Sequence, residues 1–300
     1  MAETHSIRAL MSHLIDYAGL FPPAQLEMGP TVRNYASYLA SEDEWMLGRL
    51  IVPVARLDEF EREAEALLPM DGSSHEPWLL SALTAPAGEA KLADDLARIR
   101  EFNACYSASG RAMIDAIELK AASSDAIDEA LEIVPDELFA FFELPVDIDP
   151  RGLLASLAGS DAGAKIRTGG VTPELYPTPA QVARFIRACG ASGVPFKATA
   201  GLHHPLRHRN EAVGADEFGF LNVFLGACLA VTADVDDAEL INLLCESDAS
   251  AFKLDDDGVT WRQHVIPTSK VEQVRERTAI AFGSCSFDEP REDLRAMRLM

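Results

Sequence analysis

The feature that most constrains the fold is a regular alternation of short apolar runs with amphipathic stretches along the whole chain. The apolar runs have the length and residue types of buried β-strands, and the stretches between them repeat apolar residues at helical spacing. We predict strands over 47–54, 78–84, 112–120, 138–145, 163–168 and 195–200, a weaker one over 250–255, and a first strand within 15–19. About eight strand and helix units of this length are typical of a (β/α)8 TIM barrel.

Helical patterns separate these strands. We predict helices over 57–68, 89–102, 124–133, 150–157 and 178–190, with an N-terminal helix beginning near His5 and another from about Ser269. A doubly wound open sheet is the alternative architecture. No Gly-x-Gly-x-x-Gly turn follows an early strand to favour it.

Composition favours one domain over residues 1–300, an N-terminal helix and a barrel followed by a C-terminal extension. Barrels of 300 residues are often single domains, and 48% hydrophobic residues can fill a large core. Within the extension, Asp256-Asp257-Gly258 has the turn chemistry of a β-hairpin. This hairpin would either decorate the last strand or act as a lid.

The net charge of −22 argues against nucleic acid as a partner, because a phosphate-binding surface needs a basic stripe. No apolar run is long enough to cross a bilayer, and no secretory signal pattern begins the chain, so we expect a cytoplasmic protein without a membrane partner. A homo-oligomer is compatible with the sequence. The five cysteines lack the close spacing of a zinc site or a disulfide framework, so we expect buried free thiols. We also expect neither a metal nor a cofactor.

Two lysines near the ends of apolar runs are the main chemical signal. They lie in Lys165-Ile166-Arg167-Thr168-Gly169 and Lys197-Ala198-Thr199-Ala200-Gly201. Buried lysine is scarce and is usually retained for chemistry that uses its amine. Because side chains alternate along a strand, Lys165 and Arg167 share one face, and so do Lys197 and Thr199.

Other polar residues also fall where barrel strands end, which is where barrel enzymes place their chemistry. Beside Lys165 and Lys197, the catalytic candidates are Glu118 and Glu143, and either of these or Asp16 could transfer protons. The candidate substrate-binding residues are Asp16, Lys120, Arg167, Thr168, Thr199, His203, His204 and Arg207. The alternative is that these charges form an ion-pair network at the rim of the barrel, since burying charges is costly unless they are paired.

The loop from Gly201 to Arg209 contains three histidines and two arginines. It could hold an anion, transfer protons, ligate a metal or be a solvated loop. Adjacent His203 and His204 point in different directions in most backbones. If a metal binds, its expected ligands are Glu118, Glu143 and one of these histidines.

The two lysine motifs resemble the signature of the deoxyribose-phosphate aldolases, class I aldolases with a (β/α)8 fold, over about residues 163–202. The resemblance implies that Lys165, on the sixth strand, forms a Schiff base with a carbonyl substrate. It also implies that Lys197, on the seventh strand, lowers the pKa of Lys165. On physical grounds, neighbouring Arg167 and Lys197 together with desolvation would favour the uncharged amine.

The chain departs from this family at two places. Arg167 stands where the aldolases usually carry a small residue, and it could pair with Glu118 or Glu143. The Gly/Ser-rich phosphate cradle expected on the eighth strand is missing, because the corresponding run 252–258 contains the acidic residues 255–257, which would repel phosphate. The predicted substrate is therefore a small carbonyl compound without phosphate, or one whose carboxylate binds Arg167.

Three functions remain open. The first is a carbon–carbon lyase acting through Lys165 as a Schiff base. The second is an isomerase or hydrolase that uses carboxylates and histidine, with or without a metal, and no covalent catalysis. The third is a non-catalytic ligand-binding barrel. A nucleophilic Ser284 or Cys285 has no recognisable partner pattern in the sequence, and Gly283 resembles a helix C-cap.

Overall fold

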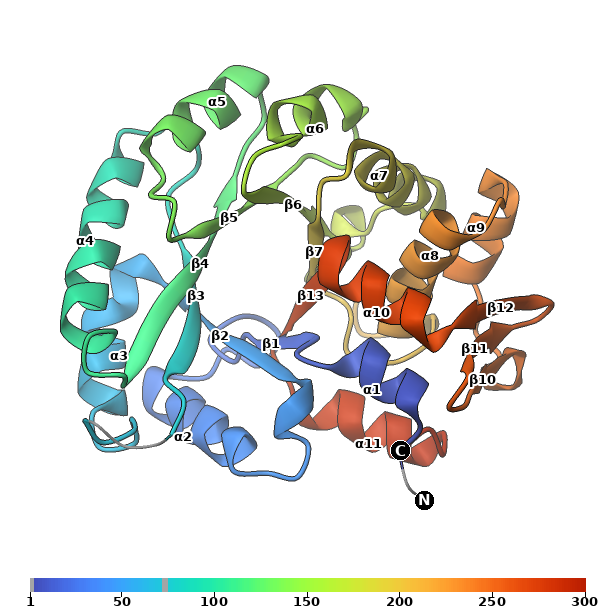
Figure 1. Cartoon of the computed structure of the whole chain (residues 1–300), viewed down its shortest axis with the longest axis horizontal. Helices are drawn as coiled ribbons and strands as arrows, with labels where there is room; N and C mark the ends of the chain where they lie inside the picture. Colours follow the sequence, from blue (N-terminus) through green and yellow to red (C-terminus); the bar gives the residue numbers. More distant parts are fainter. Residues whose placement is uncertain (1–2, 72–74) are drawn as a thin grey trace.

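The computed structural model describes residues 3–71 and 75–300, and its central feature is a closed barrel of eight parallel strands (Figure 1). The order around the barrel is β1, β13, β7, β6, β5, β4, β3, β2. These strands are β1 (Ile15–Tyr17), β2 (Leu47–Pro53), β3 (Trp78–Leu83), β4 (Ala112–Lys120), β5 (Phe139–Glu143), β6 (Ala162–Arg167), β7 (Phe196–Thr199) and β13 (Ala279–Ser284). The predicted (β/α)8 TIM barrel is confirmed.

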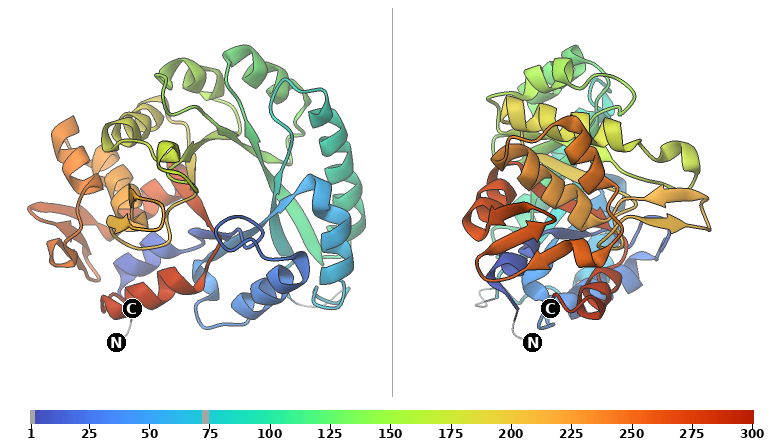
Figure 2. Two further views of the ribbon diagram at one scale, coloured as in Figure 1. Left: turned by 180° about the vertical axis from the view of Figure 1, so that it is seen from behind. Right: turned by 90° about the vertical axis from the view of Figure 1, so that its right-hand side faces the viewer.

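Helices form an outer ring around the strands, which is visible from both ends of the barrel (Figures 1 and 2). They are α1 (His5–Met11), α2 (Met28–Leu39), α3 (Leu57–Ala64), α4 (Lys91–Tyr106), α5 (Ser124–Ile133), α6 (Arg151–Leu157), α7 (Pro179–Ser192), α8 (Phe220–Thr232), α9 (Asp237–Leu244), α10 (Thr268–Arg277) and α11 (Asp288–Ala296). The bounds of α7 follow from local chemistry. Thr178 and Gln181 form a capping box at its start, and Gly193 ends it with a φ of 68°.

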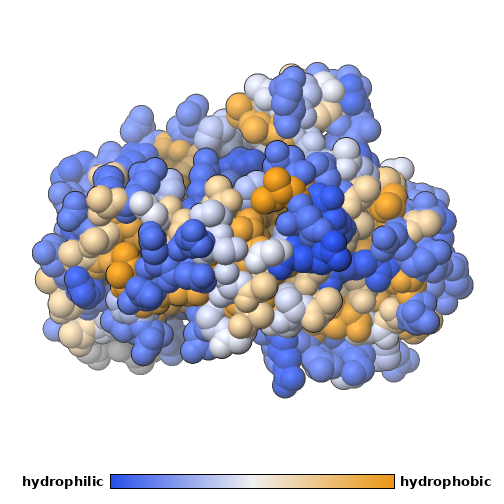
Figure 3. All heavy atoms as spheres, turned by 90° about the horizontal axis from the view of Figure 1, so that it is seen from above, coloured by the Kyte–Doolittle hydropathy of each residue, from blue (hydrophilic) through white to orange (hydrophobic). Residues whose placement is uncertain are grey.

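The hydrophobic core lies mainly between the barrel and this ring. Phe196 of β7, for example, packs against Phe185 of α7 and Phe224 of α8, with ring centroids 5.5 and 6.3 Å away. On the outside, the face in Figure 3 is mostly hydrophilic with scattered hydrophobic residues. No helix of the described residues is both long and apolar enough to cross a membrane.

The prediction for the eighth strand was wrong. Residues 279–284 form β13, which pairs with β7 on one side and with β1 on the other. Residues 252–254 instead belong to a separate antiparallel sheet of β10 (Phe252–Leu254), β11 (Gly258–Trp261) and β12 (His264–Pro267). Gly283, read from the sequence as a helix C-cap, lies within β13. The predicted helix near Ser269 is α10, which leads into that strand.

Two excursions extend from the barrel. The predicted hairpin at Asp256-Asp257-Gly258 is confirmed as the β10–β11 turn, in which Leu254 pairs with Val259. Its sheet packs beside α8 and α10, and the amide of His5 donates to Asp256, so it does not act as a lid over the C-terminal end of the strands. At that end a second hairpin, β8 (His208–Asn210) and β9 (Ala215–Glu217), projects outward (Figure 2, right).

Candidate functional site

Lys165 and Lys197 lie side by side inside the barrel. They occupy β6 and β7, the sixth and seventh barrel strands in chain order, and they are register partners. Only 3% of Lys165 and 1% of Lys197 is exposed. The alternation in the sequence explains this placement, because Ala164 and Ile166 pack outward in the core while Lys165 points inward.

Glu118 connects the two lysines from β4. Its Oε2 accepts a hydrogen bond from Lys165 Nζ at 2.9 Å, and its Oε1 accepts one from Lys197 Nζ. Ser81 Oγ of β3 donates to the same Oε1 at 2.8 Å. A single carboxylate therefore balances part of the charge of both buried ammonium groups.

Glu143 and Arg167 continue the network toward the C-terminal end of the strands. Glu143 Oε2 lies 2.9 Å from Lys165 Nζ, and Glu143 Oε1 accepts from Arg167 Nε at 3.3 Å. The Arg167 side chain is 35% exposed, whereas that of Glu143 is 10% exposed. The predicted alternative that Arg167 pairs with a carboxylate is thus confirmed, with Glu143 as the partner.

Asp16 of β1 completes the network at its other end. One of its oxygens binds Lys197 Nζ, and the other accepts from the amide of Arg49 at 2.6 Å. A side chain at Gly48 would place its Cβ 2.1 Å from Asp16 Oδ1, so this position requires glycine. The glycine allows the carboxylate to approach the β2 backbone.

We call these six residues the charge chain, because positive and negative groups alternate along it. In order from the exposed end, they are Arg167, Glu143, Lys165, Glu118, Lys197 and Asp16. Three cations face three carboxylates, so the charge chain has no net charge when all six side chains are ionised. Such pairing offsets the cost of burying the charges.

The charge chain holds Lys165 in its ammonium form. Burial alone would lower the pKa of Lys165, but attraction to Glu118 and Glu143, with hydrogen bonds to both, raises it above its ordinary value of 10.5. The expectation that Arg167, Lys197 and desolvation together favour the uncharged amine is therefore wrong for this arrangement. Both cations are themselves paired with carboxylates, which limits their repulsion of Lys165.

The two glutamates shift in the opposite direction. Burial would raise the pKa of Glu118, but attraction to Lys165 and Lys197 outweighs burial and places it far below its ordinary value. Glu143 behaves in the same way, with Lys165 and Arg167 lowering its pKa against burial. Both side chains are ionised at neutral pH and can accept protons only at a free-energy cost.

The remaining strand-end residues have different surroundings. Thr168 is buried, and its hydroxyl donates to the carbonyl oxygens of Thr199 and Ala200, which ties two loops together. Thr199 is half-buried between Arg167 and Gly283, its register partners on either side. Lys120 is exposed and pairs in register with Glu143.

Basic residues of the loop after β7 contact partners outside the charge chain. His203 Nδ1 is 3.0 Å from Glu289 Oε2, and His204 Nδ1 is 2.6 Å from Asp293 Oδ2, both carboxylates of α11. Arg207 lies over the ring of Phe218. The structure therefore brings Lys165, Lys197, Glu118, Glu143, Arg167 and Asp16 together and gives the histidines other partners.

Two residues at the site escaped the sequence reasoning. Ser81 lies within an ordinary strand pattern, and its contact with Glu118 depends on the β3–β4 pairing. Phe141, two residues before Glu143 on β5, places its ring centroid 5.8 Å from Lys197 Nζ. Strand alternation could have identified Phe141, because residues 141 and 143 share a face.

The corrected eighth strand also changes the phosphate argument. The acidic run 255–257 lies in the β10–β11 turn and not at the end of a barrel strand. The segment that ends the eighth strand is instead Gly283-Ser284-Cys285-Ser286, in which Ser284 Oγ donates to the carbonyl of Ser286 at 2.6 Å. Because the acidic run does not lie at the end of a barrel strand, it gives no reason to exclude a phosphate group from the substrate.

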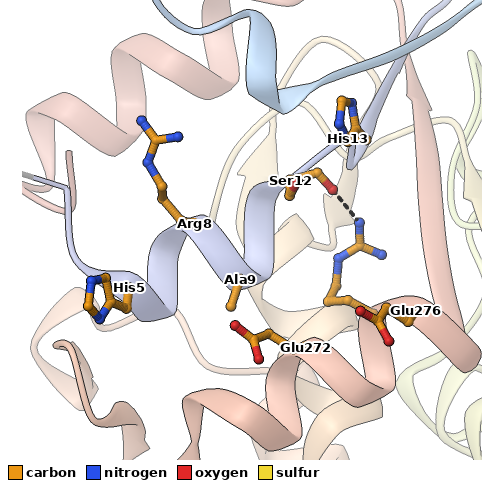
Figure 4. A pocket seen from close by; sticks show the side chains of 8 residues that line it. His5, Arg8, Ala9, Ser12, His13, Glu272 and Glu276 are labelled. Atoms are coloured by element: carbon orange, nitrogen blue, oxygen red, sulfur yellow. Dashed lines mark hydrogen bonds between the residues drawn. The ribbon is translucent and has the colours of Figure 1, made fainter.

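Neither of two cavities in the described structure has Lys165 or Lys197 in its lining. One of about 490 Å³ is bordered by α1 and α10, where the buried Arg275 donates to the carbonyl of Ser12 (Figure 4). The other, of about 520 Å³, opens at the N-terminal end of the barrel beside the Arg49–Asp115 ion pair and extends to Phe141. Among residues 3–71 and 75–300, no group of three or more His, Cys, Asp or Glu side chains is arranged to hold a metal.

Comparisons with solved structures give distant matches, of which two are described here. No protein-family model and no curated protein matches the chain. The citrate lyase beta subunit of Mycobacterium tuberculosis, complexed with oxaloacetate and magnesium, is 12% identical with a TM-score of 0.39, over 79% of this chain and 96% of that one. Protein CitE of the same organism, with magnesium and acetate, is 13% identical with a TM-score of 0.38, over 81% and 94%. The barrel assignment rests on strand order and register.

Proposed function

We propose that the protein is a carbon–carbon lyase of the class I aldolase type, in which Lys165 forms a Schiff base with a small carbonyl compound. The observation that carries the proposal is the position of Lys165 Nζ, 2.9 Å from both Glu118 and Glu143 and in register with Lys197. Schiff-base formation needs an amine nucleophile and groups that move protons during dehydration. The positions on the sixth and seventh strands agree with the resemblance to the deoxyribose-phosphate aldolases.

Lys165 is better placed than Lys197 to meet a substrate. It contacts Glu143, which contacts the partly exposed Arg167, whereas Lys197 contacts the buried Asp16. A substrate that enters from the C-terminal end of the strands reaches the Arg167 end of the charge chain first. We propose that Arg167 binds an anionic group of the substrate, since its guanidinium suits carboxylate or phosphate.

The resting ammonium must lose a proton before it can attack. Even a lysine of ordinary pKa is uncharged in only about one molecule in 2,500 at pH 7, and the pKa of Lys165 is raised further. Glu143 is the proposed acceptor of this proton. Arg167, which lowers the pKa of Glu143 in the resting site, can leave Glu143 and bind the anionic group of the substrate, and Glu143 then accepts a proton more readily. The neutral amine then attacks the carbonyl carbon, and protonation of the carbinolamine oxygen lets water leave to give the imine.

Lys197 has a supporting role in this scheme. Lys197 and Lys165 both pair with Glu118. Because Lys197 balances part of the negative charge of Glu118, Glu118 stabilises the ammonium form of Lys165 less than it would alone. Lys197 therefore acts on the pKa of Lys165 through the carboxylate of Glu118.

Reductive trapping tests the assignment to Lys165. The purified protein is treated with borohydride and a panel of small aldehydes and ketones, and adducts are located by peptide mass spectrometry. We expect a reduced adduct on Lys165 that Lys165→Met abolishes. Lys197→Met should still give an adduct on Lys165, but more slowly.

A second candidate is supported by the complete pairing of the charge chain, which is what a non-catalytic ligand-binding barrel would also need. Absence of any adduct on Lys165, while a control aldolase is labelled under the same conditions, would favour that function. An adduct that appears only on exposed lysines would also contradict the proposal.

A further inference from the structure

Cys285 is the one cysteine among the five for which the structure shows a histidine partner. It follows β13 at the C-terminal end of the barrel, and its Sγ lies 3.9 Å from Nε2 of His203 in the loop after β7. Cys189, Cys228 and Cys285 are all buried. Burial raises the pKa of the Cys189 and Cys228 thiols, to about 12 for Cys228, and neither has a histidine contact in the described part of the chain. Those two are therefore poor nucleophiles.

A carboxylate orients the histidine. Glu289 Oε2 lies 3.0 Å from His203 Nδ1, and the Glu289 amide donates to Ser286 Oγ at 3.2 Å, which fixes the start of α11. With Nδ1 donating to the carboxylate, Nε2 faces the thiol and can accept its proton. Burial alone would lower the pKa of His203, but contacts with Cys285 and Glu289 raise it to about 10, which favours holding on Nε2 the proton that the thiol gives up.

We propose that Cys285, His203 and Glu289 form a second reactive centre, in which Cys285 is a nucleophile toward activated acyl groups, His203 its base and Glu289 the residue that orients His203. The three have the geometric relation of nucleophile, base and orienting carboxylate that activates thiols in enzymes. They lie at the same end of the barrel as Lys165, and they take no part in the Schiff-base scheme.

The acyl-transfer step is balanced within this set. The proton of the Cys285 thiol first passes to His203 Nε2, which the raised pKa of His203 favours, and Cys285 Sγ then attacks the acyl carbon. The bond from the acyl carbon to the leaving oxygen then breaks, which leaves a thioester on Cys285 and releases an alcoholate. No oxidant or metal is needed.

The test uses p-nitrophenyl acetate and iodoacetamide as probes on the full chain. We expect stoichiometric release of p-nitrophenolate with one acetyl group on Cys285, and Cys285 should react with iodoacetamide faster than the exposed Cys105 and Cys245. Cys285→Ser should remove the acetyl label. His203→Gln should slow the reaction of Cys285 on the order of a hundredfold, the lower range for a positioned base.

Matched variants separate this role from general destabilisation. Glu289→Gln changes a half-exposed side chain and should slow acetylation less than His203→Gln. His264→Gln removes a histidine that also pairs with a glutamate, Glu239, and it should leave the reaction of Cys285 unchanged. The proposal is overturned if Cys285 reacts no faster than Cys105 and Cys245, or if His203→Gln reacts at the wild-type rate.

Discussion

At the scale of single residues, Glu118 lies at the centre of the site and contacts both lysines. It accepts hydrogen bonds from both buried lysines and from Ser81, and it lies in the middle of the six-residue charge chain. Its removal would leave three cations against two carboxylates inside the barrel. Removing one partner of a buried ion pair destabilises the fold more than removing one partner of an exposed pair, because water cannot solvate the charge that remains.

We therefore expect Glu118→Gln to lower the free energy of unfolding at pH 7 by about 3–5 kcal/mol. Because the folded-state pKa of Glu118 is lowered, its contribution is fully present above the unfolded-state pKa near 4.5 and is lost as the pH falls below it. The difference between wild type and variant should thus shrink in acid. Urea unfolding monitored by circular dichroism at neutral and acidic pH measures it.

An exposed glutamate provides the control for this substitution. Glu101 lies on the outer face of α4, and Glu101→Gln should change stability by no more than about 0.5 kcal/mol. If Glu118→Gln unfolds at the same urea concentration as wild type at pH 7, Glu118 does not hold the lysines as described.

At the scale of elements, barrel closure depends on β13. This strand pairs with β7 and with β1, so its backbone amides and carbonyls have neighbours on both sides. The β8–β9 hairpin is a separate two-stranded sheet, and an isolated two-stranded hairpin is marginally stable in water. The two segments should therefore open with very different free energies.

Hydrogen exchange followed by mass spectrometry checks this difference. Peptides that cover 279–284 should be protected as strongly as those that cover β6 and β7. Peptides that cover 208–217 should exchange much faster. Equal exchange in 279–284 and 208–217 would contradict the placement of β13 in the barrel.

The same strand shows where sequence reasoning reached its limit. The bounds of β4 and α5 were predicted to the residue, because each has a clear local pattern and a clear end. The pattern of 279–284 is short, follows α10 directly and contains Gly283. Its strand conformation comes from pairing with β1, which lies far away in the sequence, and local propensity carries no record of that contact.

The site was predictable to a similar extent. Strand alternation correctly placed Lys165 and Arg167 on one face, and strand order brought Glu118 and Glu143 beside Lys165. The charge state of Lys165 was not predictable, because it depends on distances of about 3 Å across three strands. The contact of His203 with Cys285 likewise needed the position of β13.

At the scale of the whole molecule, the charge is divided unequally between inside and outside. The charge chain is neutral in sum, so the net charge of −22 belongs to the rest of the protein. A negative surface slows the approach of anionic ligands. Within the charge chain, Arg167 is the cation that is partly exposed and can attract such a ligand. Function at this site therefore depends on whether Lys165, whose pKa its neighbours raise, acts as an amine nucleophile.

The most direct measurement is the pH dependence of reductive trapping on Lys165, with cyanoborohydride and one reactive aldehyde, in wild type and in Glu143→Gln. The trapping rate should rise with pH, because the raised pKa of Lys165 keeps the amine protonated near neutrality. Glu143→Gln removes one of the two carboxylates that raise this pKa, so its profile should shift to lower pH by about one unit or more, while Glu101→Gln should match wild type. An unchanged profile in Glu143→Gln, or no adduct on Lys165 at any pH, would contradict the account.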